Sequence, residues 1–190
     1  MKTNTRKIVG IGLMAAIVVV LQLLASTIKL GMFSITLTLV PIIVGAALYG
    51  IGAGALLGLA FGITVLASGD AGAFLAISVP GTIVTVLAKG VLAGLAAGAV
   101  YKAIEKKNKL AAAITAGVVA PVVNTGVFAI GCWLFFMPFI KQLAQGAGAE
   151  NAALFVLTGV IGANFFVELA INLVLATVIV RIVNIARKEK

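Results

Sequence analysis

The stretch LFVLTGVIGANFFVELAINLVLATVIV, from Leu154 to Val180, is long and apolar enough to cross a lipid bilayer as an α-helix. Within it, Asn164, Glu168 and Asn172 recur every four residues, which places their side chains on one helix face. An ionisable group at mid-membrane costs roughly 2.5–3.5 kcal/mol on insertion scales, so it should face a protein interior or a wet cavity. The stripe therefore predicts a polar site on this span. The alternative is a structural ladder of interhelical hydrogen bonds.

The composition of the whole chain is that of a polytopic membrane protein. Of its 190 residues, 63% are hydrophobic and 10% are charged, far from the averages of soluble domains. The net charge of +9 does not indicate a nucleic-acid partner, because the basic residues flank apolar runs as the positive-inside rule expects. These basic clusters are Lys2, Arg6 and Lys7, then Lys102, Lys106, Lys107 and Lys109, and finally Arg181, Arg187, Lys188 and Lys190.

The apolar segments predict one all-α domain, residues 1–190, built as a bundle of six transmembrane helices with both termini in the cytoplasm. Pro80 suits the start of the fourth helix, because proline is favoured in a first helical turn. The predicted outer loops carry only Lys29 and Lys141 as basic residues, and this asymmetry sets the orientation. The expected spans are approximately 8–26, 33–49, 52–67, 80–101, 110–136 and 153–181.

The residue types exclude most catalytic and metal chemistry. The chain has no histidine, one cysteine and five acidic residues, so a zinc centre, a histidine-based triad and a disulfide are not expected. The nucleotide-binding pattern GxxxxGK[ST] does not occur. We therefore predict no enzyme activity, no metal and no cofactor. A structural scaffold would leave the polar residues of the later spans unexplained.

The fourth and fifth spans add three polar candidates to the stripe. Thr85 and Lys89 lie inside the fourth span, and Asn124 follows Pro121 in the fifth. Lys89 and Glu168 are opposite charges at comparable depth, so they either form a structural ion pair or bind a polar solute.

The first span carries a different signal. Gly12 and Ala16 form a small-xxx-small pair, which lets another helix approach closely. Packing within the bundle and docking of an external helix are equally compatible with this pattern.

Three segments resemble a known family. They are GIGLMAAI (10–17), LTLVPIIVGAALYGIGAGALLGLAFGITVLASGDAGAF (37–74) and PVVNTGVFAIGCWLFF (121–136). With the six-span pattern, they resemble the substrate-binding S component of energy-coupling factor (ECF) vitamin transporters, over nearly the whole chain. The family often shows a proline and then a pattern close to GALYG followed by spaced glycines.

The resemblance implies a mechanism and partners. An S component in a prokaryotic plasma membrane captures a water-soluble vitamin from outside, using the first outer loop and spans four to six. It then joins a transmembrane coupling subunit and two cytoplasmic ATPases through small residues of its first helix. Here these residues are Gly12 and Ala16, with Gly10 and Ala15 nearby. The family usually shows alanine at both positions.

Within the family, SGDAGAF (68–74), LAKG (87–90) and PVVNTG (121–126) resemble the pantothenate subgroup. A carboxylate substrate would suit Lys89, and its hydroxyl and amide groups would suit Asn124, Asn164 and Asn172. Riboflavin or another vitamin is the alternative ligand, and an autonomous secondary transporter is the alternative class, although no inverted repeat is visible. Riboflavin would favour a more aromatic lining, for which the candidates are Phe74, Phe128, Trp133, Phe135, Phe165 and Phe166.

Overall fold

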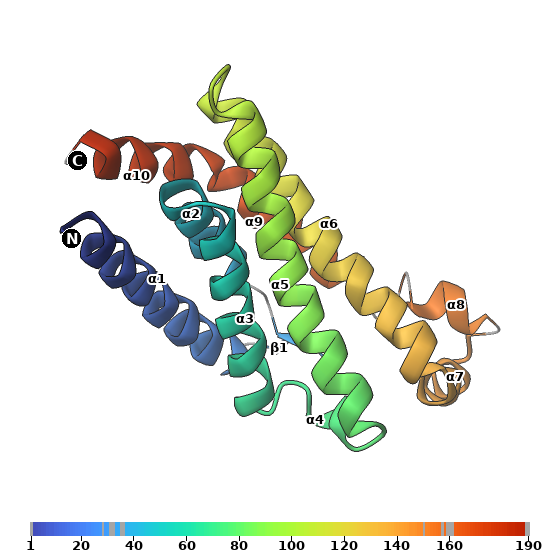
Figure 1. Cartoon of the computed structure of the whole chain (residues 1–190). Coiled ribbons are helices and arrows are strands. Elements are labelled where there is room, and N and C mark those ends of the chain that lie inside the picture. The colour runs from blue at the N-terminus through green and yellow to red at the C-terminus, as the bar shows by residue number, and fades with distance from the viewer. Residues whose placement is uncertain are drawn as a thin grey trace.

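The structure is a computed structural model, and it describes residues 2–27, 29–30, 33–34, 37–149, 151–156, 158 and 162–188. Its architecture is a bundle of long and short helices with one small hairpin (Figure 1). In chain order the elements are α1 (Lys2–Thr27), β1 (Lys29–Leu30), β2 (Phe33–Ser34), α2 (Leu39–Tyr49), α3 (Ile51–Ala67), α4 (Gly72–Leu75), α5 (Val79–Ile104), α6 (Lys109–Phe135), α7 (Met137–Gly146), α8 (Ala152–Phe155), α9 (Ala163–Val174) and α10 (Ala176–Lys188).

Three of these helices are long and apolar enough to cross a membrane, and they correspond to the predicted first, fourth and fifth spans. They are Thr5–Thr27 of α1, α5 and α6. A fourth span exists if α9 and α10, which meet at a 46° bend, are taken together. The apolar helices α2 and α3 are shorter, so the described residues support a multi-helix membrane protein without confirming six spans.

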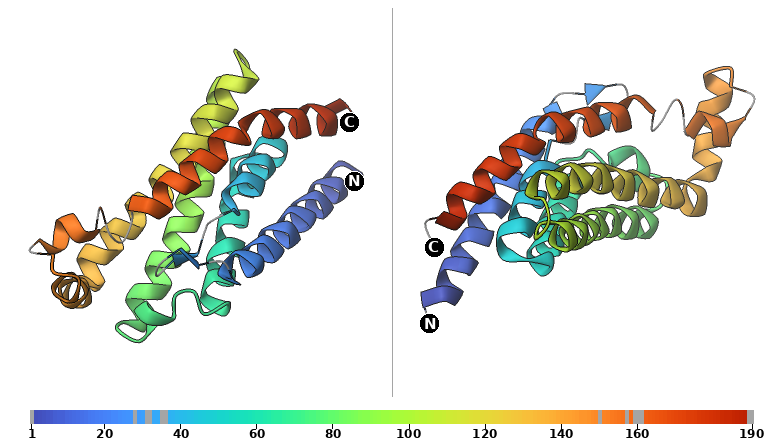
Figure 2. Two further views of the ribbon diagram at one scale, coloured as in Figure 1. Left: turned by 180° about the vertical axis from the view of Figure 1, so that it is seen from behind. Right: turned by 90° about the horizontal axis from the view of Figure 1, so that it is seen from above.

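Three helices form the centre of the bundle, with α5 packed between α3 and α6 (Figures 1 and 2). Helices α3 and α5 contact each other through glycines. Gly54 faces the carbonyl oxygen of Gly94, and Gly58 faces that of Gly90, so that a Cβ atom on any of the four would collide with the opposite backbone. Glycine allows the two backbones to approach this closely, and inside a membrane the resulting van der Waals contacts favour association of the helices. The spacing of four residues on both helices keeps the contact on one face.

The ends of α5 and α6 are defined by local hydrogen bonds. Ser78 caps α5 by accepting from the backbone N–H of Gly81 at 3.2 Å, and proline occupies the first turn as predicted. Asn108 caps α6 by accepting from Leu110 N at 2.9 Å. A tight turn therefore joins the two helices and places the basic cluster of 102–109 at one end of the bundle.

The apolar core lies between α2, α3, α5, α6 and α10. Its members share almost complete burial, and the largest are Leu39, Ile42, Ile43, Leu57, Phe61, Tyr101 and Ile179. Both chain ends and the α5–α6 turn lie toward the upper left of Figure 1, whereas α4, α7 and α8 lie toward the lower right. The basic segment 102–109 thus lies toward the same side as the two chain ends in Figure 1, and its orientation relative to a membrane stays a prediction.

Two predicted spans differ from the structure. Helix α2 begins only at Leu39, because the preceding segment contains the hairpin of β1 and β2 in place of the expected start at 33. The expected helix over 153–181 is broken, with α8 ending at Phe155 and a bend following Val174. A long apolar composition specifies burial in lipid but does not specify continuous helix.

The segment 137–151, predicted as an outer loop, contains α7. This helix has one buried side, with Ile140 and Ala144 in the core, and exposes Lys141 and Gln145. Spacing of apolar residues by four is the pattern of an amphipathic helix.

The C-terminal helix α10 is fastened to the ends of two other helices. The Arg187 guanidinium donates to Glu105 Oε2 at 2.6 Å, after the end of α5, and to the carbonyl oxygen of Ala47 in α2 at 2.8 Å. Lys109 Nζ also donates to Asn184 Oδ1 at 2.7 Å.

Candidate functional site

The polar stripe on α9 is buried inside the protein. Glu168 and Asn172 are each 0% exposed, as expected for polar residues that avoid lipid. Asn172 Nδ2 donates to the carbonyl oxygen of Glu168 at 2.7 Å, and Asn172 packs against Gly117 of α6. The side chain of Asn164, predicted to share this stripe, lies outside the described residues.

Lys89 lies on the inner side of α5 between two aromatic rings. Its Nζ atom is 5.4 Å from the centroid of the Phe61 ring in α3 and 5.5 Å from that of Phe128 in α6. Both distances fall within the range of cation–π attraction. The carboxylates of Glu168 and Asp70 act on the Lys89 charge through space. The structure thus places Lys89 and Glu168 in one electrostatic neighbourhood.

Thr85 and Asn124 extend this neighbourhood along α5 and α6. Both are 4% exposed, and Thr85 packs directly against Gly131. The contacts of Gly131 with Thr85 and of Phe128 with Lys89 fix the antiparallel register of the two helices. Asn124 lies one turn before Phe128 in α6, so it continues the polar path from Lys89 toward the turn between α5 and α6.

Several polar atoms along this path are buried and have no hydrogen-bond partner among the described residues. They are Thr85 Oγ1, Asn124 Oδ1 and Asn172 Oδ1. An unsatisfied buried polar atom costs about 1–3 kcal/mol, so these atoms are suited to a polar ligand or to water.

The aromatic residues near Lys89 include one that the sequence did not single out. Phe61 lies in a glycine-rich helix and has no polar neighbour in the sequence, so its role depends on the packing of α3 against α5. Among the expected aromatic residues, Phe128 contacts the Lys89 charge and Phe74 packs against Phe128, with ring centroids 5.4 Å apart. Trp133 and Phe166 point outward, being 60% and 67% exposed.

Gln22 and Asp70 form a second polar contact beside this path. Gln22 of α1 is 2% exposed, and its Nε2 atom donates to Asp70 Oδ2 at 2.7 Å. Asp70 belongs to the turn between α3 and α4. Asp70 belongs to the SGDAGAF segment (68–74) noted in the sequence, whereas Gln22 was not singled out there, although it is an amide within an otherwise apolar span.

The predicted docking pair lies on the outside of α1. Gly12 and Ala16 are both exposed, and no described atom lies within 4 Å of a Cβ built on Gly12. Gly10 instead packs against the Tyr49 side chain, and Ala15 packs against the core. Helix α1 therefore has one face for the bundle and another, carrying Gly12 and Ala16, that is open.

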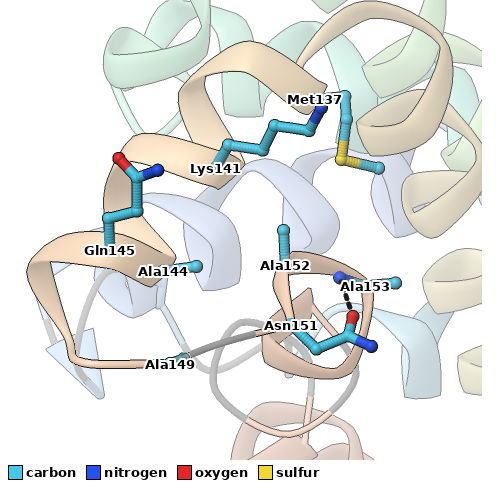
Figure 3. Close-up of a pocket in the computed structure, with 8 residues that line it drawn as sticks. All are labelled: Met137, Lys141, Ala144, Gln145, Ala149, Asn151, Ala152 and Ala153. Carbon is cyan, nitrogen blue, oxygen red and sulfur yellow. Dashed lines mark hydrogen bonds between the residues drawn. The ribbon is translucent and has the colours of Figure 1, made fainter.

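An open pocket of about 550 Å³ lies elsewhere, between α7 and α8 (Figure 3). Its lining includes Met137, Lys141, Gln145 and Asn151, and it includes none of the predicted substrate-binding residues. Within the described part of the chain, no group of histidine, cysteine, aspartate and glutamate side chains is arranged to hold a metal ion.

Comparison with known proteins gives one family match for this chain of apolar helices. The family model described as "ECF transporter, substrate-specific component" matches residues 6–180. No curated protein and no solved structure matches the chain. Because the family model covers nearly the whole length, the chain belongs to the family of substrate-specific components of ECF transporters.

Proposed function

We propose that this S component captures a small carboxylate-bearing vitamin, with pantothenate as the foremost candidate, from outside a prokaryotic plasma membrane. The observation that carries the proposal is the position of Lys89, a cation held between two aromatic rings inside the bundle. A partly buried ammonium group in an apolar bundle is a strong partner for a carboxylate, because less water competes for it there than at the surface.

The groups around Lys89 suit the rest of such a molecule. Pantothenate carries hydroxyl and amide groups, which both donate and accept hydrogen bonds. The side chains of Thr85, Asn124 and Asn172 offer the buried atoms without partners described above, and Glu168 offers a carboxylate acceptor. Asn164 is proposed as a further contact from its place in the stripe. We therefore propose that Lys89 and Glu168 both bind the ligand, and that they do not act mainly as a structural ion pair.

Transport then requires the partners of the family. ECF S components work with a transmembrane coupling subunit and ATPases, and we place the docking surface on Gly12 and Ala16 of α1. The open space around Gly12 supports this choice, since an approaching helix meets no side chain there. Cytoplasmic termini and six spans complete the proposed topology.

Thermal unfolding of the purified protein with a panel of water-soluble vitamins tests the substrate. A ligand that binds only the folded state raises the melting temperature, by an amount that grows with its concentration relative to Kd. At concentrations well below millimolar, pantothenate should stabilise the native protein and the Lys106→Gln variant, which changes an exposed lysine, but not Lys89→Gln or Glu168→Gln.

Other outcomes have distinct meanings. Stabilisation by riboflavin alone would retain the family role and overturn the choice of pantothenate. The absence of any shift, in protein shown to be folded, would contradict vitamin capture and favour an autonomous transporter of another solute.

A further inference from the structure

The pocket between α7 and α8 lies at the end of the bundle opposite the chain termini (Figures 1 and 3). One wall is α7, which contributes Met137, Lys141 and Gln145. The other wall is the start of α8 with the residues just before it, including Asn151. Its volume of about 550 Å³ is within the range of small-molecule sites.

The chemistry of the lining favours a small anion with an apolar portion. Among the described residues that line the pocket, Lys141 carries the one charge, and its ammonium group lies beside Met137 in Figure 3. The Asn151 side-chain oxygen Oδ1 accepts from Ala153 N at 2.9 Å, so the Nδ2 group of the same amide is the part that can donate to a ligand. Alanine methyl groups and the Met137 thioether supply the apolar surface.

A short aromatic cluster separates this pocket from Lys89. Met137, which lines the pocket, also packs against the cluster that contains Phe74 and Phe136. The ring of Phe74 meets those of Phe136 and Phe128 at centroid distances of 4.9 and 5.4 Å. Phe128 in turn lies over the Lys89 ammonium group. Two cations are therefore placed on either side of one aromatic cluster.

We infer that the α7–α8 pocket is an outer docking site, where Lys141 binds the carboxylate of a small amphiphilic anion before that anion reaches Lys89. This inference rests on the proposed function for the class of ligand, but it concerns a separate pocket and separate residues. Electrostatic attraction by a cation at the outer end raises the local concentration of an anionic solute.

The experiment uses methyl-labelled methionine in the full-length protein, because Met137 reports on the pocket and Met14 of α1 does not. Pantothenate is titrated into the Lys89→Gln variant, and the Met137 methyl resonance is followed by NMR. We expect a saturable shift in the millimolar range, with Met14 unchanged. Adding Lys141→Gln should weaken this binding at least tenfold. Panthenol, the neutral alcohol analogue, should also bind at least tenfold more weakly than pantothenate.

A Met137 shift that is unchanged by Lys141→Gln, or equal for panthenol, overturns the outer docking site. The same holds if Met137 does not respond. The thermal-shift assay on the native protein is scored separately. Stabilisation by pantothenate without a Met137 response removes only the outer site, whereas a Lys141-dependent Met137 response without stabilisation removes only capture at Lys89.

Discussion

The Gln22 amide of α1 donates a 2.7 Å hydrogen bond to the Asp70 carboxylate, which lies in the turn between α3 and α4. This contact links the helix proposed to dock on a coupling subunit to the turn that precedes Phe74. The Asp70 charge also acts on Lys89. One hydrogen bond therefore joins α1 to the surroundings of the candidate site.

Replacing Gln22 with leucine should destabilise the protein. The change removes a hydrogen bond to a charged group, worth about 1.5–3 kcal/mol, from a site that is 2% exposed. Thermal unfolding should show a lower melting temperature than for Gln142→Leu, the same change at an exposed position of α7. Equal melting temperatures for the two variants would show that this hydrogen bond does not stabilise the fold.

Replacing Gly58 with alanine should disrupt the packing of α3 against α5. The added methyl group collides with the carbonyl oxygen of Gly90, and overpacking of this kind costs about 1–3 kcal/mol. The control is Gly126→Ala in α6, where a Cβ meets no described atom within 4 Å and where alanine favours the helix. Thermal unfolding should separate the two variants, and a Gly58→Ala protein as stable as Gly126→Ala would refute this packing.

Replacing Phe128 with leucine should weaken ligand binding at Lys89. The Phe128 ring helps to hold the Lys89 ammonium group in position, and a cation–π contact is worth about 0.5–2 kcal/mol, so loss of this positioning should raise Kd by up to roughly 30-fold. Calorimetric titration with pantothenate provides the measurement. Phe139→Leu is the control, because this ring also packs against Phe74 but does not lie over Lys89. Equal effects of the two substitutions would assign the loss to the aromatic cluster alone.

Replacing Arg187 with alanine should loosen α10 without unfolding the bundle. The ion pair with Glu105 is partly exposed, with side chains 34% and 18% accessible, so the expected cost is about 1 kcal/mol or less. Hydrogen exchange in α10 should become faster than in Lys188→Ala, which alters an exposed neighbour. Unchanged exchange would mean that apolar packing of Ile179 and Val183 holds α10 by itself.

Replacing Gly12 with leucine should prevent assembly while leaving the S component able to bind its vitamin. The bulky side chain fills the open face of α1, where no described atom lies near Gly12. Co-purification with the coupling subunit and ATPases measures assembly, and the thermal-shift assay measures binding. Gly126→Leu introduces the same side chain at another open helical glycine and should assemble normally. Normal assembly of Gly12→Leu would place the docking surface elsewhere.

The sequence predicted the membrane class and the main helices well, because apolar length and flanking charge determine them. The expected segments 52–67, 80–101 and 110–136 coincide closely with the helices α3, α5 and α6, of which α5 and α6 are long enough to cross a membrane. The break between α9 and α10 was missed, since uniform apolarity gives no sign of where a backbone bends. Helix α7 was missed although its apolar residues recur at helical spacing.

For the candidate site, sequence reasoning identified buried polar residues but could not determine how the helices face one another. Burial of Thr85, Asn124, Glu168 and Asn172 agrees with the expectation that polar groups avoid lipid. Which aromatic rings lie around Lys89 depends on how α3 and α6 are rotated about their own axes. In a span that is apolar on every face, the hydrophobic pattern does not indicate this rotation. A direct role of these polar residues and rings in substrate binding remains a prediction.

The glycine contacts between α3 and α5 also limit which parts of the molecule can rearrange. At Gly54 and Gly58 the two backbones meet directly, so no side chain lies between them that could change rotamer and alter the distance between the helices. Helices α3 and α5 should therefore move together as one rigid unit. Structural adjustment during a transport cycle would then involve elements other than this pair, such as α9 and α10, which meet at a 46° bend.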